Sequence, residues 1–220
     1  MLLVLVVVLG VWGFAELADE VIEGDTRAVD EWIIRAMRTP GNPSDAVGPM
    51  WFEGTVRDVT ALGSAAVITI VLVAVIGFVA IRRQYHALGL IIVSVAGGGL
   101  INLLLKHFFA RPRPDLVEPL MRETSASFPS GHSLLSAVVY LTLGALLTRL
   151  VQPKRLKLYI ITTALFLSFI VGLSRVYLGV HYPTDVLAGW TVGLVWAVVC
   201  WLVAARLQKR GWVEEANDAE

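Results

Sequence analysis

The sequence predicts an all-α fold, a six-helix transmembrane bundle with a short amphipathic helical segment on the non-cytoplasmic side. Of its 220 residues, 56% are hydrophobic and 16% are charged, and the mean hydropathy is +0.72. This composition is too apolar for an ordinary soluble domain. Apolar runs of about 20 residues, the length that a helix needs to cross the hydrocarbon core, recur along the chain. No repeat or linker divides it, so residues 1–220 are expected to form a single membrane domain.

Six apolar segments are the predicted membrane spans. They lie at about residues 1–18, 59–81, 87–105, 133–148, 158–174 and 186–205. The first is ambiguous, because a secretory signal peptide has a similar apolar stretch and Gly13, Phe14 and Ala15 could form a cleavage site. No positive charge precedes this stretch, which favours a membrane span. The fourth is slightly short, and its flanking residues His132 and Arg149 are expected to lie at the interfaces.

Lysine and arginine side chains set the predicted orientation. They gather in the loops after the second, fourth and sixth spans, at Arg82, Arg83, Arg149, Lys154, Arg155, Lys157, Arg206, Lys209 and Arg210. Short loops rich in these residues face the cytoplasm. The opposite face then receives residues 19–57, 106–132 and 175–185.

Residues 19–57 contain one amphipathic helical pattern. Asp25 is expected to cap this helix, and the Pro40-Gly41 pair is expected to end it. Its apolar face has helical spacing and comprises Val29, Trp32, Ile33, Ala36 and Met37. Such a helix could lie on the membrane surface and shape an entrance for lipid, or it could be a simple packing lid. The pattern leaves both interpretations open.

A first cluster of charged residues follows the third span, where Lys106 and Arg113 stand beside two prolines. Cations on this face run against the usual distribution, so they call for an explanation. A phosphate group supplies one, because Arg113 can hold two oxygens in a fork while Lys106 acts as a point charge. Taken alone, a solvated basic loop would look the same.

A second cluster, Pro129-Ser130-Gly131-His132, precedes the fourth span. A turn that leads into a helix presents free backbone N–H groups, which form an anion site. Gly131 lets the backbone approach an oxygen closely, and Ser130 adds a hydroxyl donor. His132 would then be placed to give a proton to a bound group, although a lone histidine at a helix start is usually structural.

The third cluster joins the fifth span to the sixth and contains Arg175, His181, Pro183 and Asp185. Pro183 suits the start of a helix, so His181 should stand just outside it while Asp185 falls in the first turn. The carboxylate can then bind one imidazole nitrogen and leave the other as a nucleophilic lone pair. All three clusters are predicted to meet at one face of the membrane.

Together the clusters resemble the three signature motifs of the type 2 phosphatidic acid phosphatase (PAP2) family. K-x6-R-P matches Lys106, Arg113 and Pro114, P-S-G-H matches Pro129 to His132, and S-R-x5-H-x3-D matches Ser174, Arg175, His181 and Asp185. The soluble vanadium haloperoxidases share this site, but the predicted spans argue against that class. Arg111 and His107 fall outside the motif positions and are assigned no catalytic role.

The resemblance implies a specific role for each of these residues. His181 would be the nucleophile that forms a phosphohistidine, Asp185 would orient it, and His132 would protonate the leaving group. The phosphoryl oxygens would be held by Lys106, Arg113, Ser130, Gly131 and Arg175. No metal and no other cofactor would be required. The sequence itself has no zinc-type cysteine pattern, and none of its four histidines lies in an H-E-x-x-H arrangement.

The resemblance further implies a lipid phosphatase of the cell membrane, multi-pass, with its active site on the periplasmic or extracellular face. Its partners would be the bilayer and a lipid phosphate such as undecaprenyl diphosphate, phosphatidylglycerophosphate or phosphatidate. A lipid phosphotransferase or a non-enzymatic lipid-phosphate carrier could use the same site. Nucleic acid is excluded as a partner, because the net charge is zero and no long basic run exists.

Overall fold

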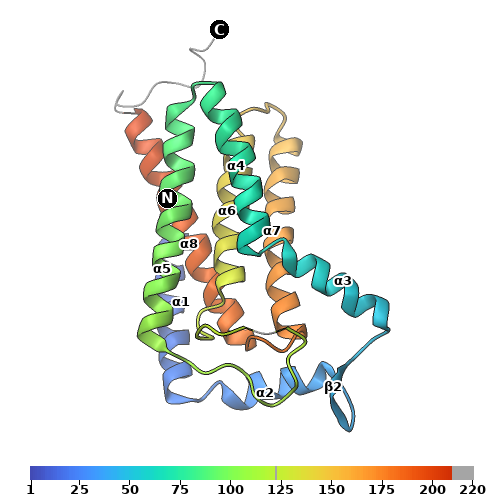
Figure 1. Cartoon of the computed structure of the whole chain (residues 1–220). Coiled ribbons are helices and arrows are strands. Elements are labelled where there is room, and N and C mark those ends of the chain that lie inside the picture. Colours follow the sequence, from blue (N-terminus) through green and yellow to red (C-terminus); the bar gives the residue numbers. More distant parts are fainter. Residues whose placement is uncertain (122, 210–220) are drawn as a thin grey trace.

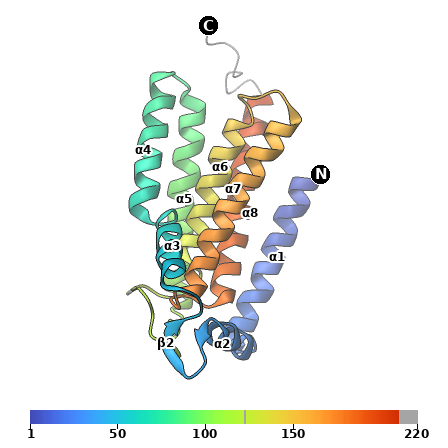
Figure 2. The ribbon, with the colours of Figure 1, turned by 90° about the vertical axis from the view of Figure 1, so that its right-hand side faces the viewer.

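The computed structural model describes residues 1–121 and 123–209, which form a helical bundle with a small β-hairpin at one end (Figure 1). The helices are α1 Leu2–Glu23, α2 Arg27–Ala36, α3 Met50–Ala61, α4 Ala65–Ile81, α5 Tyr85–Phe109, α6 Gly131–Leu147, α7 Lys154–Tyr177 and α8 Pro183–Lys209. The strands β1 Arg38–Thr39 and β2 Asn42–Ala46 pair antiparallel. Helices α1 and α4 to α8 run side by side, and α2 lies across one end of them (Figure 2).

The predicted number of six spans is not confirmed. In the part of the chain that the structure describes, α1, α5, α7 and α8 are long and apolar enough to cross a membrane. Together α3 and α4 would make one further span, bent by 47°. Helix α6 is apolar but has only 17 residues. Each predicted segment still overlaps at least one helix of the bundle, so the chain is a multi-pass membrane protein.

The predicted second span is interrupted where α3 meets α4. Ser64 begins α4, because its side chain accepts a hydrogen bond from the backbone N–H of Val67. Gly63 packs tightly against the α6 and α7 helices, since a Cβ there would lie 2.4 Å from Val171 Cγ1 and 3.2 Å from His132 Cδ2. The break therefore brings the end of α3 beside a predicted site residue.

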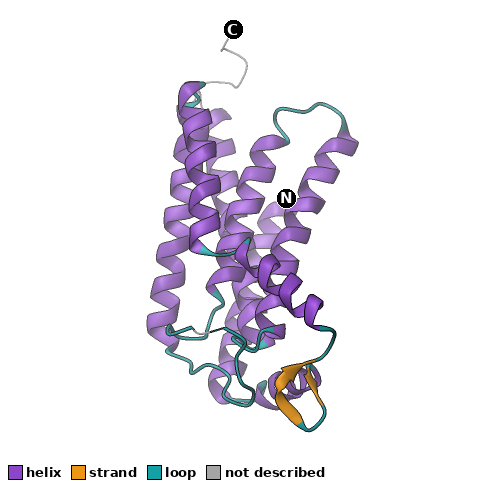
Figure 3. Ribbon diagram, turned by 45° about the vertical axis from the view of Figure 1, so that its right-hand side comes forward, coloured by secondary structure: helices purple, strands orange, loops and turns teal. Residues whose placement is uncertain are grey.

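Helix α2 confirms the amphipathic segment but not its details. The helix begins after Thr26 rather than after Asp25, and it buries Asp30 and Ile34 while Trp32 points outward. Of the predicted apolar face, Ile33 and Met37 pack against the core, whereas Val29, Trp32 and Ala36 are exposed. The inner face is organised around a charged residue, Asp30. Helix α2 also ends before Pro40-Gly41, which instead form the turn of the β-hairpin, an addition to the predicted all-α fold (Figure 3).

Helices α6 and α8 share the most extensive contact of the bundle. A Cβ at Gly189 would lie 2.6 Å from the carbonyl oxygen of Ser130, and one at Gly193 would lie 2.7 Å from that of Leu134. Small residues allow such close approach between helices in a membrane. The backbone N–H of Ser130 also donates to the carbonyl oxygen of Asp185 at 2.9 Å. The starts of α6 and α8 are thereby fixed to each other.

We expect Gly189→Ala to destabilise the protein, because its methyl group would overlap backbone atoms of α6. Overpacking of this kind costs about 1–3 kcal/mol, which thermal unfolding in detergent measures as a lowered midpoint. Gly77→Ala on α4 is the matched control, since nothing lies within 4 Å of a Cβ at that position. Equal midpoints for the two variants would contradict the close contact.

Candidate active site

The side chains of the three clusters meet at the end of the bundle that α2 crosses. They are Lys106 in the last turn of α5, Arg113 in the loop after it, Ser130, Gly131 and His132 at the start of α6, Arg175 in the last turn of α7, His181 in the α7–α8 turn and Asp185 in the first turn of α8. His132 and Lys106 lie near enough to Arg113 and Arg175 for their charges to interact.

Asp185 holds the imidazole ring of His181. Its Oδ2 lies 3.3 Å from His181 Nδ1 and accepts hydrogen bonds from the Ser127 hydroxyl at 2.5 Å and the Tyr182 backbone N–H at 2.9 Å. Asp185 and His181 are 0% and 2% exposed. A carboxylate beside Nδ1 places the proton on that nitrogen, so Nε2 keeps its lone pair.

The lone pair of His181 faces a cation. Its Nε2 lies 3.3 Å from Nη1 of Arg113. Burial lowers the pKa of His181 to about 4, although the neighbouring Asp185 carboxylate acts in the opposite direction. The ring is therefore neutral at pH 7 and able to act as a nucleophile.

Arg113 beside His181, and Lys106 near Arg113, are held by groups from two loops. Arg113 donates to the carbonyl oxygens of Ser125 and Val180, each at 2.7 Å. Lys106 Nζ donates to the Ser125 hydroxyl at 3.2 Å and to the carbonyl oxygen of Ala126. These contacts fix the cations in advance, which lowers the entropy that they lose on binding an anion.

Arg175 is a fully buried cation that retains a free donor. Its Nη1 donates to the Thr60 hydroxyl at 3.0 Å, and its Nη2 donates to Glu123 at 2.5 Å. Within the described residues, its buried Nε has no hydrogen-bond partner. A buried donor without an acceptor is costly, so this atom is suited to an oxygen of a bound ligand.

At the start of α6, Ser130 caps the helix, whereas the sequence predicts that its hydroxyl donates to a phosphate. The Ser130 Oγ accepts hydrogen bonds from the Ser133 backbone N–H at 3.4 Å and from its hydroxyl at 3.0 Å. Gly131 lies close to α5, since a Cβ there would be 3.2 Å from Asn102 Nδ2. The roles of Ser130 and Gly131 toward a phosphate remain predictions.

Sequence reasoning missed three charged residues of the site. Arg111, which was assigned no role, forms ion pairs with Asp185 at 2.7 Å and with Asp30 at 2.9 Å. Glu123 pairs with Arg175 and lies 3.9 Å from Arg113. Arg111, like Arg113, is a cation on the face of the membrane where cations are unusual, so the sequence does contain a signal for it. Asp30 and Glu123 had no such signal, because neither lies in a motif.

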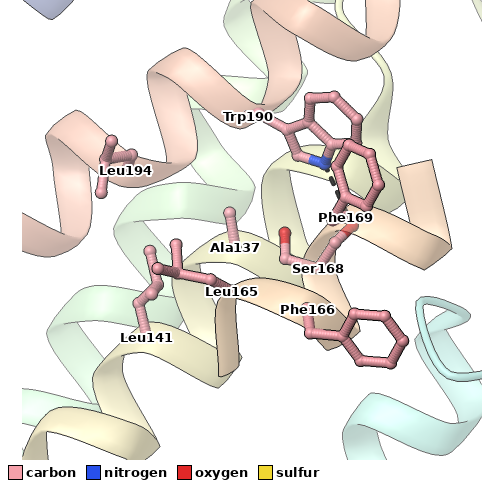
Figure 4. Close-up of a pocket in the computed structure, with 8 residues that line it drawn as sticks. All are labelled: Ala137, Leu141, Leu165, Phe166, Ser168, Phe169, Trp190 and Leu194. Atoms are coloured by element: carbon pink, nitrogen blue, oxygen red, sulfur yellow. Dashed lines mark hydrogen bonds between the residues drawn. The ribbon is translucent and has the colours of Figure 1, made fainter. Parts of the chain in front are cut away.

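An apolar cavity of about 420 Å³ lies between α6, α7 and α8 (Figure 4). Ala137, Leu165, Phe169 and Trp190 are among the side chains that line it. The Trp190 Nε1 donates to the carbonyl oxygen of Ser168 at 3.0 Å, which fixes the indole ring at one side of the cavity. Trp190 follows Asp185 along α8, so the cavity lies farther along the bundle than the charged cluster, and half-exposed Leu165, Phe166 and Phe169 leave it open to the outside.

Comparison with known proteins gives consistent results. Residues 87–209 match the PAP2 superfamily. Phosphatidylglycerophosphatase B of Bacillus subtilis is 35% identical over 150 residues, which cover 66% of this chain and 71% of that protein. Undecaprenyl-diphosphatase of Sulfolobus acidocaldarius is 34% identical over 110 residues, which cover 47% of this chain and 48% of that protein.

The fold agrees with a solved structure. The crystal structure of a transmembrane PAP2-type phosphatidylglycerolphosphate phosphatase from Bacillus subtilis superposes with a TM-score of 0.83 and 28% identity, covering 91% of this chain and 96% of that one. The matched residues 87–209 span more than half of the chain and contain all three clusters. The chain therefore belongs to the PAP2 superfamily and is a phosphatase.

Proposed function

We propose that the protein hydrolyses the phosphomonoester or diphosphate of a membrane lipid through a phosphohistidine on His181. The observation that supports this most directly is the buried His181 ring, which has the Asp185 carboxylate at Nδ1 and the Arg113 guanidinium at Nε2. A nucleophile, an orienting carboxylate and a cation for the phosphoryl oxygens therefore lie next to one another.

The proposed reaction has two steps. The Nε2 of His181 attacks phosphorus and the bond from phosphorus to the lipid oxygen breaks, while a proton from His132 neutralises the leaving oxygen. Burial and the neighbouring Arg175 lower the pKa of His132 to about 3, so His132 carries this proton only when the negative charge of the bound phosphate lies beside it. Water then attacks the phosphohistidine, His132 accepts its proton, and inorganic phosphate leaves as the phosphorus–nitrogen bond breaks. Asp185 stabilises the charge that the His181 ring carries in between.

The cations would stabilise the charge that develops on the phosphoryl oxygens. Arg113 and Arg175 lie near His181, and Lys106 lies near both arginines and Asp185. The buried Nε of Arg175 has a free N–H for this purpose. Fixed cations of this kind act most strongly where water is excluded. Metal independence is part of the proposal, because these side chains supply the positive charge that Mg²⁺ provides in many phosphoryl-transfer enzymes.

A lipid substrate is supported by the surroundings of the site. The apolar cavity beneath the charged cluster is suited to a hydrocarbon chain, whereas the cations at the bundle end are suited to a phosphate. The Bacillus relative makes phosphatidylglycerophosphate the first candidate, and undecaprenyl diphosphate and phosphatidate follow. We also propose that the site faces the periplasm or the exterior, because Arg82, Arg83 and Lys154 lie at the opposite end.

We expect the purified protein to release inorganic phosphate from at least one of these three lipids in detergent with excess EDTA. His181→Ala should lower the rate by at least about 100-fold, since it removes the nucleophile. His107→Ala is the control, because His107 is an exposed residue of α5 outside the motifs.

The outcomes of this assay separate the alternatives. Transfer of phosphate to a second lipid without release would indicate a phosphotransferase, and binding with no turnover would indicate a carrier. Release that EDTA abolishes would contradict metal independence. Full activity of His181→Ala would refute the phosphohistidine.

We expect the imidazole of His181 to stay neutral on acidification from pH 8 to pH 5, because its pKa is lowered to about 4. The groups that face it are Asp185, Arg113, Arg175 and His132. Protonation would occupy the attacking lone pair, so the nucleophile is lost only as the pH falls through about 4. Nitrogen-15 NMR of labelled histidine follows this titration, with His181→Ala assigning the signal. A midpoint near 6.5 would contradict the effect of burial.

A further inference from the structure

The surface helix α2 contributes a charged residue to the active site. Asp30 is 81 positions from Arg111 in the sequence, and its Oδ2 accepts a hydrogen bond from Arg111 Nη2 at 2.9 Å. We propose that Asp30 and Arg111 are positioning residues, which hold Asp185 and through it the ring of His181. This inference rests on the proposed function, since it assigns a purpose to the geometry of that same site.

Arg111 spans two carboxylates. Its Nη1 donates to Asp185 Oδ1 at 2.7 Å, and its Nη2 donates to Asp30. The side chain is only 14% exposed, and the guanidinium lies 4.3 Å from the centre of the Tyr182 ring. A planar fork held on both sides and on one face has little freedom to rotate. A displacement of Asp30 would therefore move Arg111, and Arg111 would in turn displace Asp185.

Asp30 also binds the first turn of α8. Its Oδ1 accepts from the backbone N–H of Thr184 at 3.1 Å, and its Oδ2 accepts from the Thr184 hydroxyl at 2.6 Å. The first N–H groups of a helix have no partner within the helix, and negative charge is favourable beside them. Asp30 is thus an N-terminal cap supplied by a different helix, adjacent to the residue that orients His181.

The two oxygens of Asp185 have separate tasks. Oδ2 contacts Nδ1 of His181 and accepts hydrogen bonds from the Ser127 hydroxyl and the Tyr182 backbone N–H, whereas Oδ1 accepts a hydrogen bond from Arg111. Without Arg111, Oδ1 would lose this donor and the carboxylate could rotate away from the ring. Misplacement by about 1 Å costs about 100-fold in rate when a reaction depends on alignment. Binding of phosphate depends on other residues, so the loss should fall on kcat.

The test compares Asp30→Asn with Glu31→Gln in the phosphate-release assay. Glu31 is the neighbour of Asp30 on α2, but its carboxylate pairs with Arg27 and Arg35 at the surface. We expect Asp30→Asn to lower kcat by about 10- to 100-fold with KM within about threefold, and Glu31→Gln to match the wild type. Arg111→Lys should resemble Asp30→Asn, because an ammonium group cannot bridge two carboxylates with a planar fork.

A second readout does not need turnover. In nitrogen-15 NMR, the Nδ1 signal of His181 should shift in Asp30→Asn and stay unchanged in Glu31→Gln. If the wild type releases no phosphate, the proposed function fails while this signal still decides the positioning. Wild-type kcat and an unmoved signal in Asp30→Asn would overturn the inference alone. Should Asp30→Asn not fold, Asp30→Glu replaces it, since the longer side chain keeps the charge but displaces Arg111.

Discussion

Burying an ionised carboxylate costs several kcal/mol unless other groups compensate its charge, and Asp185 is 0% exposed. Its compensation comes from the Arg111 guanidinium and the Ser127 hydroxyl, which are 74 and 58 positions away in the sequence, and from the nearby Tyr182 N–H. The contacts from Arg111 and Ser127 form only when the loop after α5 lies against the start of α8. The need to neutralise one carboxylate thus organises the whole end of the bundle, including the ring of His181.

The second constraint is the distance between α6 and α8. His132 lies in the first turn of one helix and Asp185 in the first turn of the other, and the hydrogen bond from the Ser130 N–H to the Asp185 carbonyl oxygen joins the two starts. Gly189 makes this possible because no side chain separates the helices. The close packing of α6 against α8 therefore also sets the relative position of His132 and Asp185.

The sequence predicted those parts of the site that depend on local spacing. His181 and Asp185 are four residues apart across a helix start, and Arg113 stands where cations are unusual, so both could be recognised. The Asp30–Arg111 pair could not be recognised in the sequence. Its residues are 81 positions apart, and their contact depends on how α2 packs. The bend at Gly63 was missed for a similar reason, since hydropathy runs through it without a break. The hairpin escaped notice because its strands have only two and five residues.

Helix α2 limits how far the amino-terminal part of this protein can be shortened without disturbing the site. The segment that matches the superfamily, residues 87–209, includes Arg111 but not Asp30. A chain trimmed to that segment would keep every motif, yet its buried arginine would lose one of two counter-ions and α8 would lose its cap. The functional unit is therefore larger than the segment that matches the superfamily, and helix α2 belongs to it.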